Sequence, residues 1–204
     1  MTRGFLLWTG VLLAAAAVMR LPLLSVRPMH TDEAVHAAKF DRLLEAGIYE
    51  YDPLEYHGPA LSYATLVFAR MEGKSGYADL TESFLRSVPA VFGILTVLLP
   101  FLFWDLIGRR AAVFASLLLA LSPAFVFYSR YYIHEMLLVF FMGCLLGCLW
   151  RYVKKPGWGW SVSAGLSAGL MFATKETSIL IIISAVLTAL FLWGISFRRR
   201  DGTG

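Results

Sequence analysis

Three polar stretches interrupt an otherwise apolar chain, and each carries side chains that are able to do chemistry. The candidate residues among them are His30, Asp32, Glu33 and His57 in the first; Arg130, His134 and Glu135 in the second; and Lys175 and Glu176 in the third. An ionised carboxylate can accept the proton of an attacking hydroxyl group. Arginine and lysine can hold a phosphate, and imidazole with carboxylate suits several divalent metal ions. These residue types favour chemistry at a phosphate or at a metal.

The residues of the first stretch also have structural interpretations. Asp32 and Glu33 follow Thr31, a suitable helix N-cap, and acids in a first helical turn stabilise the helix by about 0.3–1 kcal/mol. His30 and Asp32 together form a candidate divalent-metal site. His57 precedes a helix that starts at Pro59, so it either contacts a ligand or merely leads into that helix.

The other two stretches are equally open. Arg130 is either an anchor at the membrane interface or a phosphate-binding group. His134 and Glu135 either cap the helix that follows or belong to a site. Lys175 and Glu176 either pair within an ordinary turn or place Lys175 against a lipid phosphate.

The composition identifies the environment of these residues. Of the 204 residues, 58% are hydrophobic, and the mean hydropathy is +0.66. Such a chain is too apolar for an ordinary soluble domain and indicates an integral membrane protein. The lipid bilayer is therefore an expected partner, and nucleic acid is not.

The apolar runs predict an all-α bundle of about six membrane spans. The expected spans are Phe5–Leu24, Phe84–Ile107, Ala111–Phe127, His134–Trp150, Gly159–Ala173 and Ser178–Phe197. A secretory signal peptide is the alternative for the first run, but no clean cleavage site follows it. Arg86, near the start of the second span, is interpreted as a membrane anchor.

Residues 28–83 form a long loop between the first two spans. Within it, helical spacing predicts an amphipathic helix over Thr31–Ala46, closed by Gly47, that lies along the membrane surface. Pro59 starts a second helix that runs to about Met71 and is too short to span a bilayer. The loop thus carries two helices next to the membrane.

The charges of the links predict the orientation. With the N-terminus inside, nine basic residues face the cytoplasm, namely Arg3, Arg109, Arg110, Arg151, Lys154, Lys155, Arg198, Arg199 and Arg200. The two short outer links carry only Arg130 and Lys175, which fits the positive-inside rule. Charges near membrane depth are costly unless they are paired or line a wet cavity. We therefore expect Asp32, His57, Glu135 and Lys175 to converge in one outward-facing pocket.

The order of four motifs resembles that of the GT-C glycosyltransferases, which include protein O-mannosyltransferases and aminoarabinose transferases. The motifs are the acidic pair Asp32-Glu33, His57-Gly58-Pro59, the segment around Arg86 and Pro89, and the link Gly169–Lys175. Within that superfamily, the first two are most similar to a flippase-activity-associated family of archaeal and bacterial glycosylation.

This resemblance implies a membrane glycosyltransferase of the plasma membrane. The enzyme would move a sugar, with inversion, from a polyprenyl-phosphate donor to a protein, lipid or glycan acceptor at the outer face. Asp32 would be the base, with Glu33 supporting it by orienting it or by binding the acceptor or a metal. His57, Arg130, His134, Glu135, Lys175 and Glu176 would bind substrate, and a divalent metal would be the cofactor, if any.

Two alternatives to an enzyme stay open. One is a non-catalytic component that binds or translocates the lipid carrier, and the other is a transporter fragment. The clustering of polar residues at one interface argues against a transporter, whose polar or broken helices lie near the midplane. Members of the superfamily are usually much longer, so we expect residues 1–204 to be the N-terminal transmembrane part of a larger GT-C-like domain whose C-terminal half is absent here.

Overall fold

The structure is a computed structural model, and it describes residues 3–51 and 57–201. The described part is helical, with no β-strand and one isolated bridge between His57 and Lys175. Its elements are α1 (Arg3–Arg20), α2 (Thr31–Ala46), α3 (Ala60–Met71), η1 (Tyr77–Asp79), α4 (Glu82–Thr96), η2 (Leu99–Phe103), α5 (Trp104–Ile107), α6 (Arg109–Leu121), α7 (Pro123–Ser129), α8 (Glu135–Lys154), α9 (Trp158–Thr174) and α10 (Ser178–Asp201). The all-α prediction is confirmed.

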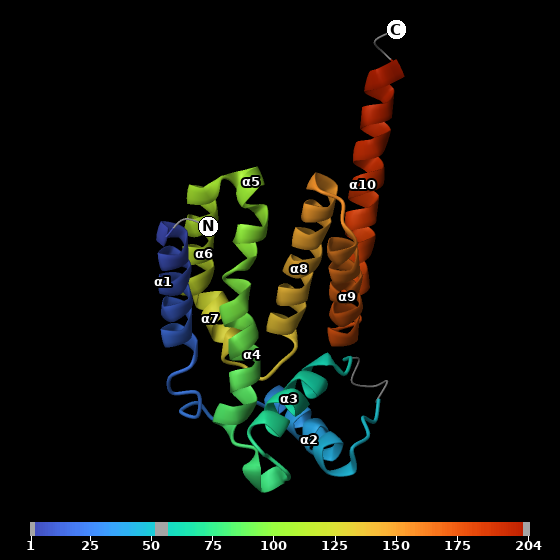
Figure 1. The fold of residues 1–204 in the computed structure, drawn as a ribbon. Helices are drawn as coiled ribbons and strands as arrows, with labels where there is room; N and C mark the ends of the chain where they lie inside the picture. Colours follow the sequence, from blue (N-terminus) through green and yellow to red (C-terminus); the bar gives the residue numbers. More distant parts are fainter. Residues whose placement is uncertain (1–2, 52–56, 202–204) are drawn as a thin grey trace.

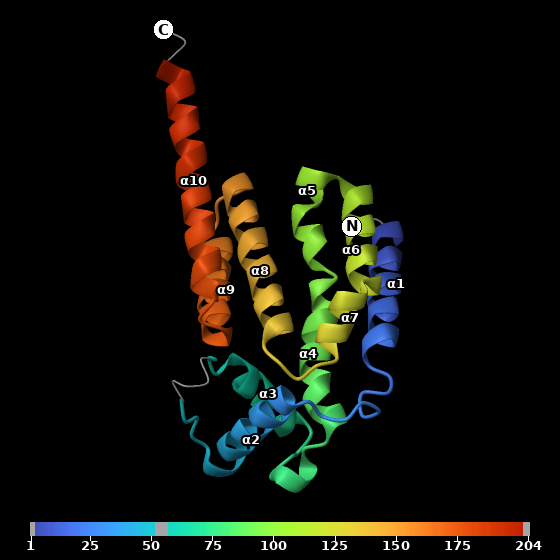
Figure 2. The same cartoon turned by 180° about the vertical axis from the view of Figure 1, so that it is seen from behind.

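The long helices stand side by side, and two shorter ones lie across one end. Figures 1 and 2 show α1, α4, α6, α8, α9 and α10 as a bundle of upright helices, with α2 and α3 beneath it. The start of α1 and the end of α10 point away from α2 and α3. The predicted loop therefore forms a cap over one end of the bundle.

The six membrane crossings stay a prediction, because several of the helices are shorter than a full span. Within the described residues, two continuous segments are long and apolar enough to cross a membrane, Glu82–Ile107 and Glu135–Lys154. Helices α6 and α7 are long and apolar enough to cross a membrane only when they are taken together, and the chain bends by 57° between them. The apolar stretches Gly4–Arg20 and Ser178–Thr188 are shorter than a full span.

The predicted third span, Ala111–Phe127, is broken rather than continuous. Helix α6 ends at Leu121, and Ser122 links it to Pro123, the first residue of α7. Proline has no backbone N–H to donate and its ring clashes with the preceding turn, so the helix cannot continue straight through it. The bend turns α7 toward the link that leads to the functional site.

The two helices of the loop have the predicted extents, with small corrections at their starts. His30, not Thr31, is the N-cap of α2, because its side chain accepts the N–H of Asp32 and its own N–H is bound by Glu33. Pro59 is the N-cap of α3 rather than its first residue. Gly47 ends α2 with a φ of 71°, as the sequence predicted.

A shared core fixes the cap against the bundle. The buried stripe of α2 packs with α3, α4 and the link before α8, and its members include Phe40, Leu43, Leu61, Leu85, Val88 and Tyr132. The hydroxyl of Tyr132 forms a 2.8 Å hydrogen bond with Thr65 of α3. This core determines where the N-terminal turn of α2 lies.

Arg20 joins α1 to the bent α6–α7 pair. Its guanidinium is fully buried and donates to the carbonyls of Leu119 and Ala120 and to the hydroxyl of Ser129. Gly93 allows this contact, because a Cβ there would lie 2.0 Å from the Ser129 hydroxyl oxygen.

Residues 52–56 of the predicted loop and the residues after Asp201 lie outside the described ranges.

Candidate functional site

A pocket opens where α2, the start of α3 and the α7–α8 link meet. It has a volume of about 210 Å³, and its lining residues are Asp32, Val35, His36, His57, Ile133, His134 and Glu135. We call it the histidine pocket. Four predicted site residues, Asp32, His57, His134 and Glu135, line it together although they are distant in the sequence.

Asp32 presents an accessible carboxylate at one side of the pocket. Its side chain is 63% exposed, and the phenol of Tyr131 donates to Oδ2 over 3.4 Å. It stands in the first turn of α2 and lines the pocket. The geometry therefore suits a group that exchanges protons with a bound substrate.

Glu33 is the next residue, yet it is completely buried. Its carboxylate accepts hydrogen bonds from both Nε and Nη2 of Arg86, from Arg27, and from the backbone N–H groups of His30 and Tyr132. Burial alone would raise the pKa of Glu33, but the hydrogen bonds from Arg86, His30 and Tyr132 outweigh it and lower the pKa. Both oxygens are occupied by protein donors, so this geometry favours an orienting role for Glu33 over direct binding of acceptor or metal.

Arg86 is part of the same interaction and not a simple membrane anchor. Its side chain is 1% exposed and lies 2.7 Å from Glu33, and it also donates to the backbone carbonyls of Leu24, Arg27 and Pro28. The pair therefore joins α4, the α1–α2 link and α2. It fixes the first turn of α2, and thereby the position of Asp32.

Lys175 was expected in the same pocket, but it is not a lining residue and instead contacts Glu135 and His57, which are. Its ammonium group lies 3.0 Å from Glu135, and its backbone pairs with that of His57. The carboxylate of Glu176 lies 3.9 Å from Nδ1 of His57. Lys175 and Glu176 are thus paired across segments rather than with each other in a local turn.

Gly58 makes this contact possible. A Cβ at this position would lie 2.1 Å from the backbone oxygen of Ala173, at the end of α9. Only glycine lets the two backbones approach so closely without a shift. The His57-Gly58-Pro59 segment therefore places an imidazole in the pocket and brings α9 against it.

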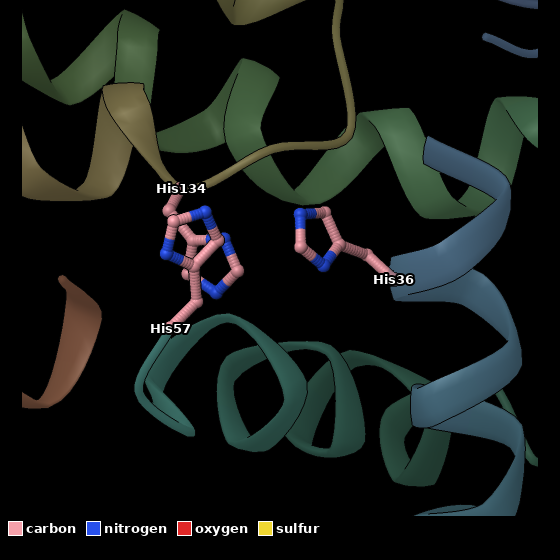
Figure 3. Close-up of side chains that lie close together, drawn as sticks. All are labelled: His36, His57 and His134. Atoms are coloured by element: carbon pink, nitrogen blue, oxygen red, sulfur yellow. The ribbon is translucent and has the colours of Figure 1, made fainter. Parts of the chain in front are cut away.

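Three imidazoles meet inside the pocket. Figure 3 shows His36 from α2, His57 from the turn before α3 and His134 from the α7–α8 link directed toward one another. Their ring centroids are 4.6 to 5.7 Å apart. Burial lowers the pKa of His36 to about 4 and that of His134 well below its usual value, which keeps both rings neutral near pH 7.

Two predicted site residues are engaged elsewhere. Arg130 is not in the histidine pocket, because its guanidinium donates to backbone carbonyls at the end of α1, including those of Pro22 and Leu23. This contact ties the start of the α7–α8 link to the end of α1. In the proposed His30–Asp32 metal pair, Nδ1 of His30 accepts the N–H of Asp32 and is used as a helix cap.

Sequence reasoning missed His36 and the role of Arg86. His36 lies four residues after Asp32, so the two share a helix face, and that spacing was a readable signal. The partner of Arg86 carried no such signal, because Glu33 lies 53 residues away.

A family described as dolichyl-phosphate-mannose-protein mannosyltransferase matches residues 57–200. No curated protein matches the chain. A similar solved structure is archaeal oligosaccharyltransferase AglB from Archaeoglobus fulgidus in complex with an inhibitory peptide and a dolichol-phosphate, with a TM-score of 0.71 and 19% identity.

That structural match covers 88% of this chain and 24% of the oligosaccharyltransferase chain. The chain thus spans about a quarter of the length of that protein, and at this identity the likeness establishes the fold. The family match covers more than half of the sequence and includes His57, His134 and Lys175. By this match, the chain belongs to the dolichyl-phosphate-mannose-protein mannosyltransferase family.

Proposed function

We propose that this chain forms the N-terminal part of a membrane glycosyltransferase that moves a sugar from a polyprenyl-phosphate donor to an acceptor hydroxyl. The observation that carries the proposal is that two adjacent acids at the start of α2 have different environments. Glu33 is buried and bound to Arg86, whereas the adjacent Asp32 is exposed to the histidine pocket. A family of dolichyl-phosphate-mannose-protein mannosyltransferases and the fold of an oligosaccharyltransferase with bound dolichol-phosphate support the donor class.

The reaction assigned to the pocket is a single displacement at the anomeric carbon. The acceptor oxygen forms a bond to that carbon while the bond to the phosphate oxygen breaks, and the electron pair leaves with the polyprenyl phosphate. Asp32 takes the acceptor proton as the attack proceeds. Lys175 offsets the charge of the departing phosphate, and for this its ammonium group has to be shared between Glu135 and the donor.

The membrane orientation belongs to this proposal. The cap formed by α2 and α3 lies at the end of the bundle opposite to the start of α1 and the end of α10 (Figures 1 and 2), and α2 contributes residues to the histidine pocket. Together with the excess of basic residues in the other links, this supports an orientation with the pocket at the outer face. A lipid-linked donor would then present its phosphate beside the pocket from the outer leaflet.

The test is sugar transfer by purified protein from a panel of polyprenyl-phosphate sugars, in the natural full-length context. Asp32→Asn keeps the shape of the side chain but removes the charge, and we expect transfer to fall by about 10²–10⁴-fold. Glu45→Gln is the matched control, because Glu45 is an exposed acid at the other end of α2. Donor binding, measured separately, should be retained in both variants.

The same experiment distinguishes the alternative of a non-catalytic lipid-carrier protein. If Asp32→Asn transferred sugar as well as the parent protein while Lys175→Ala abolished donor binding, the catalytic role of the pocket would be lost. The pocket would then be a lipid-carrier binding site.

A further inference from the structure

The three histidines of the pocket form a ligand set of their own. One nitrogen from each of His36, His57 and His134 can be chosen so that all three lie within 4.8 Å of one another. The rings come from three separate segments and point inward to a common space (Figure 3). No local sequence constraint requires this arrangement, so tertiary packing has gathered them.

His134 carries the most specific signal. Its side chain is only 4% exposed, and its Nδ1 has no hydrogen-bond partner although it is buried. The backbone of Gly58 lies close enough to the imidazole to act on it electrostatically. A histidine that ligates a metal through one nitrogen commonly donates its other N–H to a backbone carbonyl or a carboxylate.

His57 has a comparable outer contact. The carboxylate of Glu176 lies 3.9 Å from its Nδ1, which is near the ring but beyond hydrogen-bond distance. Carboxylate–histidine pairs of this kind are frequent around metal ions, where they fix the tautomer and raise the basicity of the ligand nitrogen. Two of the three imidazoles thus have a carboxylate or backbone neighbour of the type that supports metal-binding histidines.

The charge around the pocket also favours a cation. Asp32 and Glu135 line it, and Glu176 stands behind His57. Lys175 neutralises Glu135, and Lys39 is close enough to act on His36. Three carboxylates against two ammonium groups leave a negative balance before any cation binds.

We propose that His36, His57 and His134 bind one borderline divalent transition-metal ion, of which Zn²⁺ is the best example, with one nitrogen each. Three imidazoles are a preferred ligand set for such ions, and the fourth position is left to water from the pocket. Tetrahedral ligands at about 2.0–2.1 Å from zinc stand roughly 3.4 Å apart, so the nitrogens have to close by about 1.4 Å at most. Rotation of the side chains of His36 and His57, which are not fully buried, supplies this movement.

The proposal concerns metal binding and does not depend on sugar transfer. A bound ion would join α2, the turn before α3 and the α7–α8 link at one point, and it would raise the stability of the cap. It uses none of the carboxylates as ligands, which separates it from a site for Mg²⁺ or Mn²⁺, ions that prefer oxygen ligands.

The experiment measures zinc on the full chain, purified in detergent and stripped with chelator. After ZnCl₂ is added and unbound metal is removed, elemental analysis should find one zinc per chain, and thermal unfolding should shift upward. Cobalt(II) in place of zinc should give the intense visible absorption of a four-coordinate site. Each of His36→Asn, His57→Asn and His134→Asn should weaken zinc binding by more than the roughly 10–100-fold that loss of an outer-shell partner costs.

The fourth histidine of the chain provides the control. His30→Asn keeps a residue that caps helices well, lies outside the cluster and should leave zinc binding unchanged. Circular dichroism and gel filtration verify that each variant is folded before binding is interpreted. The proposal would be overturned if the parent protein bound no stoichiometric zinc, or if the three cluster variants bound zinc as tightly as the parent. It would also be overturned if Asp32→Asn and Glu135→Gln lost zinc binding while the cluster variants kept it.

Discussion

Removing the charge of Glu33 should destabilise the protein far more than removing the charge of its neighbour. Glu33→Gln keeps the size of the side chain but leaves the buried guanidinium of Arg86 without its counter-charge. The parent carboxylate accepts five hydrogen bonds, two from Arg86, one from Arg27 and two from backbone amides. Breaking a buried ion pair by removing one partner costs about 3–5 kcal/mol.

The assay is reversible unfolding of the purified chain in mixed micelles, followed by circular dichroism. A loss of about 3 kcal/mol corresponds to a drop of more than roughly a hundredfold in the folded-to-unfolded ratio. Asp32→Asn is the matched control, because Asp32 is exposed and should cost less than about 1 kcal/mol. Equal stability of the two variants would refute the structural role assigned to Glu33.

Acid provides a second measurement of the same interaction. The pKa of Glu33 is lowered in the folded chain, so the charge contributes stability that is present above the unfolded-state pKa of about 4.3. This stability is lost as the pH falls through the folded-state pKa. Glu33→Gln should remove that part of the acid dependence, whereas Asp32→Asn should leave it. A parent protein whose stability is flat across this range would contradict the reasoning.

Three further outcomes follow from the geometry. Gly58→Ala places a methyl group against the backbone oxygen of Ala173 and should cost about 1–3 kcal/mol in unfolding free energy while lowering transfer activity; an unchanged melting temperature would show that the backbones separate freely. Arg130→Gln should lower thermal stability, because the end of α1 loses its donor, but leave donor binding unchanged in a lipid-binding assay. A cysteine at Ser75 should react with an impermeant reagent added outside intact cells and one at Lys155 should not, and the reverse pattern would invert the proposed orientation.

The sequence alone determined the elements that depend on local patterns. Apolar runs predicted the upright helices, and helical spacing with Gly47 predicted the extent of α2, because side-chain periodicity and glycine caps are properties of neighbouring residues. The cost of isolated charges in a membrane also predicted that Asp32, His57, Glu135 and Lys175 would converge. The first three line one pocket, and Lys175 contacts Glu135 without lining it. These features need no knowledge of the partner helices.

Only the tertiary structure separated Asp32 from Glu33. Consecutive residues of a helix point about 100° apart, so one of the pair had to face away from the other, but the sequence does not tell which. Packing of α2 against α4 decides it, since Arg86 is held there with its charge unpaired unless Glu33 turns inward. The sequence identified a pair of acids, and burial gave each acid a different environment.

The gathering of His36, His57 and His134 was likewise decided by the fold. These residues come from α2, the turn before α3 and the α7–α8 link, and no spacing rule connects positions so far apart in the chain. Their meeting depends on the close approach of Gly58 to α9 and on the core around Tyr132 that holds the cap to the bundle. Contacts of this kind arise from the packing of whole elements, and therefore local residue patterns could not predict them.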